Sequence, residues 1–263
     1  MWRPVGLVEG ANSVREDPGV AQPVSTGLRL ERVARRQAGT AVLAATSIVP
    51  FLVAYIGYEL ARSAALALRG VIAYEPLVSI ERRFLGEPLA VILSVYRNKL
   101  LDIVTGIVYA VHPIYFLLFS LYLIYRDIIL SRGLLASFAT ASTVAILVYA
   151  LYPTAPPWIA IPGVSRPPNL LLELVESILG SRVDPNPFAA IPSMHVCMAT
   201  IFAYYYWRVS GRMAPGAAWV ILMAFSTLYT ANHYLVDVVA GSMLGLVSCS
   251  VGWRLAKPSS RPD

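Results

Sequence analysis

Residues 215–253 read PGAAWVILMAFSTLYTANHYLVDVVAGSMLGLVSCSVGW, an apolar stretch that Asn232, His233 and Asp237 interrupt near its centre. A helix needs about 20 residues to cross the ~30 Å hydrocarbon core of a bilayer. The stretch is therefore too long for one crossing and long enough for two. The whole chain of 263 residues is 57% hydrophobic and 14% charged, whereas an ordinary soluble domain has about 25% charged residues. These features predict an all-α polytopic membrane protein.

Four more apolar runs of similar length precede this stretch, which gives six transmembrane helices in total. They are expected at about 40–60, 100–125, 134–152, 191–208, 215–232 and 234–253. Between the first two, residues 61–99 interleave apolar residues with Glu75, Glu81 and Glu87, which is typical of an amphipathic segment at the membrane interface. The proline-rich loop 153–190 contains NLLLELVESILG (169–180), whose spacing predicts a short helix between an Asn169 N-cap and a Gly180 C-cap. This loop is either a lid or a simple connector.

Basic residues indicate the orientation of the chain. The formal charge is +6, and this excess sets topology and contacts anionic lipids rather than nucleic acid. With six spans, four basic clusters fall on one side, which is therefore the cytoplasmic side; segment 61–99 is a basic exception on the other side. The clusters are Arg29, Arg32, Arg35 and Arg36, then Arg126 and Arg132, then Arg208 and Arg212, and last Arg254, Lys257 and Arg261.

The chain divides into three parts by composition. Residues 1–38 are polar, lack an apolar signal-peptide core, and are expected to be a disordered cytoplasmic N-terminus. Residues 39–253 form the membrane catalytic domain, and residues 254–263 form a cytoplasmic tail. Both termini are expected inside an integral membrane protein, with the plasma membrane as its location.

Polar residues gather at one predicted depth near the non-cytoplasmic face. His195 opens the fourth span, and Asn232, His233 and Asp237 lie where the fifth span meets the sixth. His233 and Asp237 are four residues apart, so they are expected to share a helix face. Ionisable residues are costly inside a membrane, and several that converge indicate a functional site. A carrier would instead need polar residues at several depths.

Two kinds of chemistry use two histidines and a carboxylate. In nucleophilic catalysis, a carboxylate holds one neutral imidazole for attack on phosphorus, and a second imidazole protonates the leaving oxygen. In a metal site, the same residues coordinate zinc or iron. The sequence lacks a local pair such as H-E-x-x-H and an evident partner for each histidine, so we expect no bound metal.

The segments IPSMH (191–195) and HYLVD (233–237) resemble motifs of the type 2 phosphatidic acid phosphatase superfamily, a group of membrane lipid-phosphate phosphatases and phosphotransferases with a six-helix core. Pro192, Ser193 and His195 match the motif P-S-G-H, with Met194 in place of glycine. Ser226, His233 and Asp237 match S-R-x5-H-x3-D, with Thr227 in place of arginine. Arg166 and Pro167 match the end of K-x6-R-P, with Ile159 in place of lysine.

The segments YPTAPPW (152–158), NPFAAIPSMH (186–195) and HYLVDVVAG (233–241) also resemble the inositol phosphorylceramide synthase branch. The resemblance covers roughly residues 95–253. It implies that His233 is the nucleophile, Asp237 its orienting partner and His195 the general acid, with no cofactor. Ser193 is expected to bind substrate as part of its motif.

Charge neutralisation is needed at any phosphoryl site, so other basic residues must replace the missing lysine and arginine. Arg166 is the first candidate, followed by Arg97 and Lys99 at the external end of the second span. His112, next to Pro113 within that span, either lines the substrate cavity or is a hydrogen-bonded structural residue.

These observations predict an enzyme that acts on a lipid-linked phosphate at the non-cytoplasmic face through a phosphohistidine intermediate. With a lipid hydroxyl as acceptor it is a head-group transferase of the inositol phosphate type, which the branch motifs favour. With water it is a lipid phosphate or polyprenyl pyrophosphate phosphatase. Its expected partners are a lipid phosphate substrate and membrane lipids, and the sequence does not indicate an oligomeric state.

Overall fold

The computed structural model describes residues 49, 52–53, 55–61, 63–64, 73–169, 173–174, 177–178 and 188–257. All of them belong to the unit Ala41–Asp263. This part of the chain is helical and contains two isolated β-bridges but no strand, as expected for an all-α protein. The disorder expected for residues 1–38 concerns residues outside the described ones.

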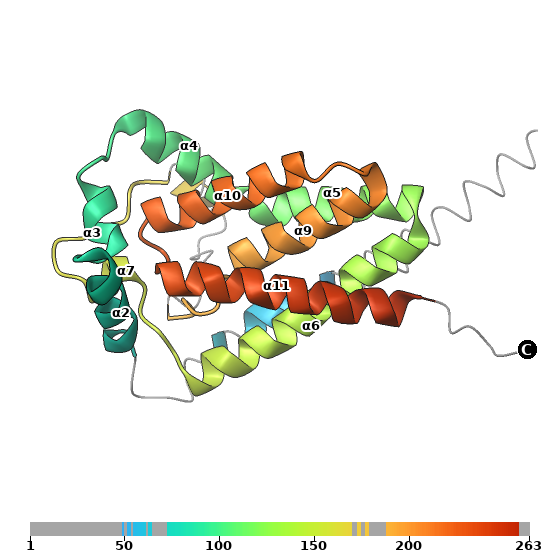
Figure 1. The fold of residues 1–263 in the computed structure, drawn as a ribbon, viewed down its shortest axis with the longest axis horizontal. Coiled ribbons are helices and arrows are strands. Elements are labelled where there is room, and N and C mark those ends of the chain that lie inside the picture. Colours follow the sequence, from blue (N-terminus) through green and yellow to red (C-terminus); the bar gives the residue numbers. More distant parts are fainter. Residues whose placement is uncertain are drawn as a thin grey trace, which may run out of the picture. The chain divides into compact units, whose positions relative to one another are not determined.

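The helices follow one another along the chain in the order drawn in Figure 1. They are α2 (Glu75–Leu85), α3 (Leu89–Ser94), α4 (Lys99–Ala110), α5 (His112–Arg126), α6 (Ile128–Leu151), α7 (Pro157–Ala160), α9 (Met194–Ser210), α10 (Ala214–Tyr229) and α11 (Leu235–Ala256).

Two of these helices, α6 and α11, are long and apolar enough to cross a membrane on their own. The bent pair α4–α5 gives a third candidate span, and α10 is a shorter apolar helix. Residues 55–61, within the first predicted span, are helical. The described residues therefore support two or three spans by length and composition, and the number six remains a prediction.

The second predicted span is a pair of helices bent by 46° rather than one straight helix. The break at Val111 is explained by Pro113, which lacks an N–H and cannot continue an α-helix through the preceding turn. An unbroken helix would have used that N–H to reach the carbonyl oxygen of Tyr109. His112 Nδ1 lies 3.1 Å from this oxygen, and because a carbonyl can only accept, the imidazole donates the hydrogen bond that the proline cannot.

Two other helices have different limits from those expected. Helix α6 begins earlier, because the Asp127 side chain accepts hydrogen bonds from the N–H groups of Ile129 and Leu130 as an N-cap. Arg132 therefore lies inside α6 instead of preceding it. Helix α10 ends at Tyr229, before Asn232, and the next residues form a turn in which Ala231 has a φ of 55°.

Helix α11 packs against both α6 and α9 through small residues. A Cβ on Gly245 would lie 2.8 Å from the Thr200 Cβ, and one on Gly252 would collide with the Ser137 side chain. Small residues allow helices to approach closely where lipid is the solvent, since apolar side chains gain little by leaving it. The buried core to which α5, α6 and α9 contribute includes Phe116, Leu123, Leu134, Phe138, Met198, Ile201 and Tyr205.

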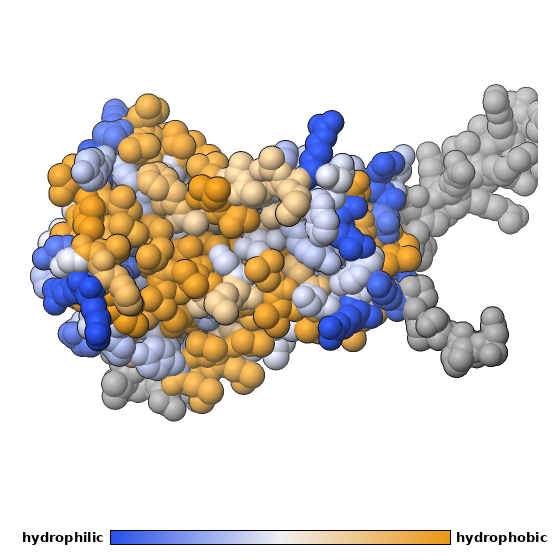
Figure 2. Space-filling model, viewed as in Figure 1, coloured by the Kyte–Doolittle hydropathy of each residue, from blue (hydrophilic) through white to orange (hydrophobic). Residues whose placement is uncertain are grey.

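Apolar side chains cover the middle of the face shown in Figure 2, and hydrophilic ones gather toward its two ends. The α5–α6 and α9–α10 turns and the C-terminal end of α11 lie together at one end, and α2, α3 and α7 lie at the other (Figure 1). Among the described residues of the basic clusters, Arg126, Arg132, Arg208, Arg212, Arg254 and Lys257 belong to the first end. This grouping agrees with their predicted placement on one side of the membrane.

Segment 61–99 contains α2 and α3, and α2 presents charged residues on one side, as an interfacial helix should. Glu81 does not follow the expected pattern: its side chain is only 2% exposed. The loop 153–190 begins with α7, a short helix that the sequence pattern did not predict. Of the short helix expected at 169–180, residues 173–174 and 177–178 are described and helical.

Candidate active site

His195 and His233 both line one cavity, with ring centroids 5.9 Å apart. His195 is the second residue of α9, whereas His233 lies in the turn between α10 and α11. The cavity holds about 560 Å³ of space free of atoms, part of it open to the outside. Residues far apart in the sequence therefore meet in one site, as predicted.

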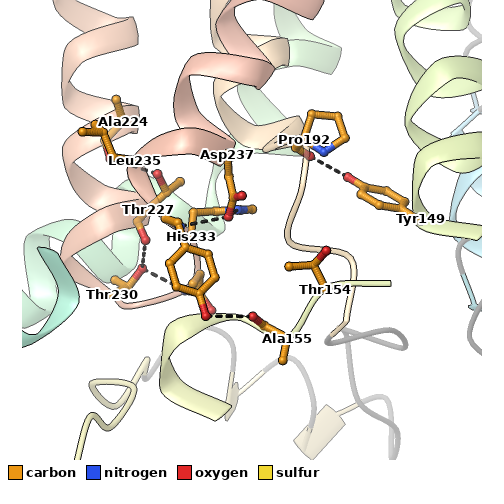
Figure 3. Close-up of polar contacts among 12 residues, drawn as sticks. Tyr149, Thr154, Ala155, Pro192, Ala224, Thr227, Thr230, His233, Leu235 and Asp237 are labelled. Carbon is orange, nitrogen blue, oxygen red and sulfur yellow. Dashed lines mark hydrogen bonds and ion pairs between the residues drawn. The ribbon is translucent and has the colours of Figure 1, made fainter. Parts of the chain in front are cut away.

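Asp237 is buried beside His233, with 3.4 Å between its Oδ2 and His233 Nδ1 (Figure 3). The pairing was expected because two residues four apart share a helix face, and that reason was wrong. His233 precedes α11 and is not part of the helix that contains Asp237. Asp237 is instead the third residue of the helix, and its carboxylate accepts a hydrogen bond of 2.8 Å from the Tyr234 N–H. This capping box folds the residues before the helix back over its first turn, which brings His233 to the carboxylate.

The backbone of Asp237 also holds the turn that carries His195. Its carbonyl oxygen accepts a hydrogen bond of 3.1 Å from the Ser193 N–H. The Ser193 carbonyl lies against Gly241, where a Cβ would collide with it. On the other side of this turn, the Tyr149 hydroxyl donates to the Pro192 carbonyl oxygen at 2.8 Å (Figure 3). One residue, Asp237, thus places both histidines.

The Ser193 side chain does not line this cavity. The residue is fully buried, and its hydroxyl has no hydrogen-bond partner among the described residues. Its observed part in the site is the backbone bond to Asp237, and substrate binding by its side chain stays a prediction.

His112 lines the cavity, which fits one of its two expected roles, and its hydrogen bond to the Tyr109 carbonyl fits the other. Its ring centroid is 3.9 Å from that of His195, and the Tyr109 ring stacks on His195 at the same separation. The hydrogen bond from His112 Nδ1 to the Tyr109 carbonyl fixes the proton on Nδ1, so Nε2 carries the lone pair when the imidazole is neutral. The α4–α5 bend is therefore what brings an aromatic ring and a third imidazole to His195.

Arg166 lies beside this aromatic group, and Arg97 contacts the residue before it in the chain. Neither arginine is among the residues that line the cavity, and Lys99 lies elsewhere. The Arg166 guanidinium carbon is 5.8 Å from the centre of the Tyr109 ring. Arg97 Nη1 donates to the Ser165 hydroxyl at 3.0 Å, so the two arginines flank the same short segment. Each arginine also has buried guanidinium nitrogen without a hydrogen-bond partner in the described part of the chain. Lys99 is exposed and lines a separate, mainly apolar groove.

The first part of the loop 153–190 is bound to the site by hydrogen bonds to backbone groups. Thr154 forms parallel bridges with Ala73 on one side and Ala189 on the other. The Trp158 N–H donates to the Ala231 carbonyl at 3.2 Å, and the Tyr234 hydroxyl donates to the Ala155 carbonyl at 3.1 Å. The first part of the loop therefore forms a wall of the site, and Trp158 lines the cavity.

A family model described as the PAP2 superfamily matches residues 75–251. The chain belongs to the PAP2 superfamily. This is the family that the two histidine motifs predict. No solved structure matches the chain.

Its curated PAP2 relatives carry the names of the expected branch. Phosphoinositol dihydroceramide synthase of Bacteroides thetaiotaomicron is 28% identical over 128 residues, which are 40% of this chain and 38% of that protein. The inositol phosphorylceramide synthase catalytic subunit AUR1 of Saccharomyces cerevisiae is 25% identical over 196 residues, 68% of this chain and 49% of that protein. Inositol phosphorylceramide synthase of Candida albicans is 23% identical over 194 residues, covering 66% and 41%. The chain thus matches less than half the length of each relative.

The two positions at which this PAP2 chain lacks the expected charges have different surroundings. Ile159 is exposed on α7. Thr227 is fully buried in α10; its hydroxyl donates to the Ala224 carbonyl at 2.9 Å, and its own carbonyl accepts from the Asn232 N–H at 3.1 Å. Thr227 therefore shapes the turn before His233 without supplying any positive charge.

Two carboxylates near the PAP2 site were not identified from the sequence. Glu81 accepts hydrogen bonds from the N–H groups of Leu235 at 2.6 Å and Leu89 at 3.0 Å, and so caps both α11 and α3. Burial raises the pKa of the Glu81 carboxyl above its usual range, although these two hydrogen bonds oppose the shift. Glu59 lines the cavity itself. It is the one charged residue of the predicted span 40–60, a signal that could have singled it out.

Proposed function

We propose that the protein is a membrane-embedded phosphotransferase or phosphatase that acts on a lipid-linked phosphate through a phosphohistidine intermediate. The observation that supports this most directly is the pair of imidazoles, His195 and His233, which line one cavity with 5.9 Å between their ring centroids. One of them has a buried carboxylate at 3.4 Å. A phosphoryl group between two such rings meets a nucleophile on one side and a proton donor on the other.

In the first step, His233 Nε2 attacks phosphorus while Asp237 holds the Nδ1 proton and stabilises the cation that forms. A P–N bond forms and the P–O bond to the lipid alcohol breaks. The leaving oxygen takes a proton from His195. The carboxylate fixes the tautomer of the nucleophile, as it does for the general base in catalytic triads.

In the second step, an acceptor hydroxyl attacks the phosphohistidine and gives its proton to His195. The P–N bond breaks, and the electron pair returns to His233. Head-group transfer to a lipid hydroxyl is favoured, because the curated relatives are named as phosphoinositol dihydroceramide and inositol phosphorylceramide synthases. With water as acceptor, the same steps describe a lipid phosphate phosphatase. For a polyprenyl pyrophosphate phosphatase, His233 attacks the terminal phosphorus, the P–O bond to the bridging oxygen breaks, and polyprenyl phosphate leaves with the proton from His195.

Arg166 and Arg97 are proposed to bind the phosphate oxygens, since a phosphoryl transition state spreads negative charge over its equatorial oxygens. His112, which lines the cavity, is proposed to contact the same substrate. No metal ion or cofactor is needed in this mechanism, because both proton transfers and the nucleophile come from imidazoles.

The proposal is tested with purified protein in detergent micelles. Phosphatidylinositol, phosphatidic acid and a polyprenyl pyrophosphate are supplied with ceramide or with water alone, and diacylglycerol, phosphate and phosphoinositol products are measured. We expect turnover that EDTA does not reduce, and an acid-labile, base-stable phosphoenzyme in a rapid quench. Turnover that EDTA abolishes and zinc restores would replace this mechanism with a metal-dependent one.

The active site is proposed to face the non-cytoplasmic side, with both termini in the cytoplasm and the plasma membrane as the location. Pro162, exposed in the external loop, and Met213, exposed in the α9–α10 turn, give a matched pair for labelling. In intact cells, an impermeant maleimide should label Pro162→Cys directly and Met213→Cys only after permeabilisation. The reverse pattern would place the site on the cytoplasmic side.

A further inference from the structure

Glu59 introduces a carboxylate into the cavity that holds the histidines. Residues 55–61 are helical, and Tyr55, Tyr58 and Glu59 from this helix all line the cavity, as the i, i+3 and i+4 spacing allows. Among the described residues that line the cavity, Glu59 is the only acidic one, and none is a lysine or an arginine. A carboxylate at membrane depth is costly and by default indicates function.

The helix that carries Glu59 is attached to the turn that carries His195. The Tyr58 hydroxyl donates to the Tyr149 hydroxyl at 3.4 Å, which in turn donates to the Pro192 carbonyl at 2.8 Å. On the same helix, the Tyr55 ring stacks on Phe138 of α6, with centroids 6.3 Å apart. Glu59 is therefore held in a fixed relation to the site.

The charge of the cavity discriminates between two kinds of phosphate. A phosphate monoester carries about −1.5 to −2 at pH 7, whereas a phosphodiester carries a single negative charge. A nearby carboxylate repels the monoester more strongly, because the repulsion grows with the charge of the substrate.

We propose that Glu59 is a specificity-determining residue that makes this site prefer a phosphodiester lipid with a hydroxyl-bearing head group over a phosphate monoester. The proposal rests on the proposed function and names the residue that selects its substrate. Besides repelling a second charge, an ionised carboxylate accepts two or more hydrogen bonds, which suits neighbouring hydroxyls of a polyol. Trp158 and Tyr55 supply apolar ring faces in the same cavity, and Asn232 adds an amide.

The test compares two donors that release the same product. Initial rates of diacylglycerol release from phosphatidylinositol and from phosphatidic acid are measured in mixed micelles containing ceramide, and the ratio of the two kcat/KM values defines the selectivity. Glu59→Gln keeps the size of the side chain and removes its charge. It should lower the selectivity for phosphatidylinositol by about 10- to 100-fold, the value of one hydrogen bond to a charged group. Glu87→Gln, at an exposed carboxylate between α2 and α3, should leave the ratio unchanged.

A selectivity in Glu59→Gln within twofold of the wild-type value would overturn the proposal. An equal loss of kcat/KM with both donors would give that result and would overturn it too. A binding measurement separates this result from failure of the proposed function. Calorimetric titration with glycerophosphoinositol should show binding to wild type that weakens about 10-fold or more in Glu59→Gln, and glycerol 3-phosphate should show the opposite trend. Equal affinities in both proteins would reject the role of Glu59 even if no donor is turned over. Absent turnover with this binding pattern would reject only the proposed reaction.

Discussion

The two sides of the candidate site are built in different ways. On the histidine side, Asp237 and Ser193 are fully buried, and a backbone hydrogen bond links the turn before His195 to the first turn of α11. On the arginine side, Arg97 and Arg166 are only half-buried. One hydrogen bond to Ser165 and a ring contact of 5.8 Å hold them.

This difference separates what the fold fixes from what a substrate must complete. His233, Asp237 and His195 are held by buried contacts within the chain itself. The guanidinium groups keep donors without partners among the described residues, and these donors gain hydrogen bonds when an anion binds. We therefore expect substitutions on the histidine side to affect mainly kcat, and those on the arginine side to affect both kcat and KM.

The histidine side should give the largest effects. His233→Ala is expected to abolish turnover and phosphoenzyme formation, because it removes the proposed nucleophile. Asp237→Asn keeps an oxygen that can accept from the Tyr234 N–H but removes the charge beside His233, and should lower kcat by at least about 10³-fold. Gel filtration and thermal unfolding in detergent serve as folding controls. A folded His233→Ala protein with wild-type kcat would exclude the nucleophile assignment.

The arginine side should give the next largest effects. Arg166→Ala is expected to lower kcat/KM by roughly 30- to 1,000-fold, as for other lost contacts to a developing phosphoryl charge. Arg166→Lys should recover little of this, since an ammonium cannot hold two oxygens as a guanidinium does. Lys99→Ala is the control, because Lys99 lines a different groove. If Arg166→Ala is neutral and Arg97→Ala is not, the phosphate site lies at the start of α4.

The same contrast explains how much the sequence could reveal. The motifs around His195 and His233 indicated the histidine side, because those residues are close in sequence to the turns that position them. The pairing of His233 with Asp237 was expected, but for the wrong reason, since spacing alone does not show where a helix begins. The capping box at Tyr234 decides that boundary.

Other features depend on contacts between distant segments. Pro113 gave a local signal for the bend in the second span, yet the approach of His112 to His195 depends on how α5 and α9 pack. Glu81 was expected to be one of the charged residues of an amphipathic segment. Nothing in segment 61–99 reveals that its carboxylate accepts a hydrogen bond from the N–H of Leu235, a residue 154 positions away.

A third, smaller effect should come from the contact that joins the two histidine turns. Gly241→Ala would place a Cβ against the Ser193 carbonyl, so α9 and α11 must separate. Small displacements of catalytic groups cost up to about 10²-fold in rate, and we expect kcat to fall about 10- to 100-fold with a lower Tm. Gly57→Ala is the matched control, since nothing lies within 4 Å of a Cβ there. Equal kcat values for the two variants would show that this close contact does not set the geometry.

The smallest effect should come from Glu81, which connects α2 to the start of α11 and is not proposed to touch substrate. Because burial raises the pKa of its carboxyl above 4.5, the folded protein binds more protons than the unfolded chain between these two pKa values. The stability that protonated Glu81 contributes is complete below pH 4.5 and is lost as pH rises through the raised pKa.

Glu81→Gln removes this titration but keeps one oxygen as an acceptor for the N–H groups of Leu235 and Leu89. The stability of wild type relative to Glu81→Gln should therefore decrease as pH rises from about 4 to 8, while the loss of one hydrogen bond lowers the stability of the variant by about 1 kcal/mol at every pH.

Thermal unfolding in detergent across this range measures the difference in stability, with the exposed Glu87→Gln as a control for the loss of a negative charge. A difference in stability between wild type and Glu81→Gln that does not change with pH would mean that folding does not change the pKa of Glu81. A large loss of kcat at unchanged Tm would instead assign Glu81 a part in positioning His233, and the histidine side would then extend to α2.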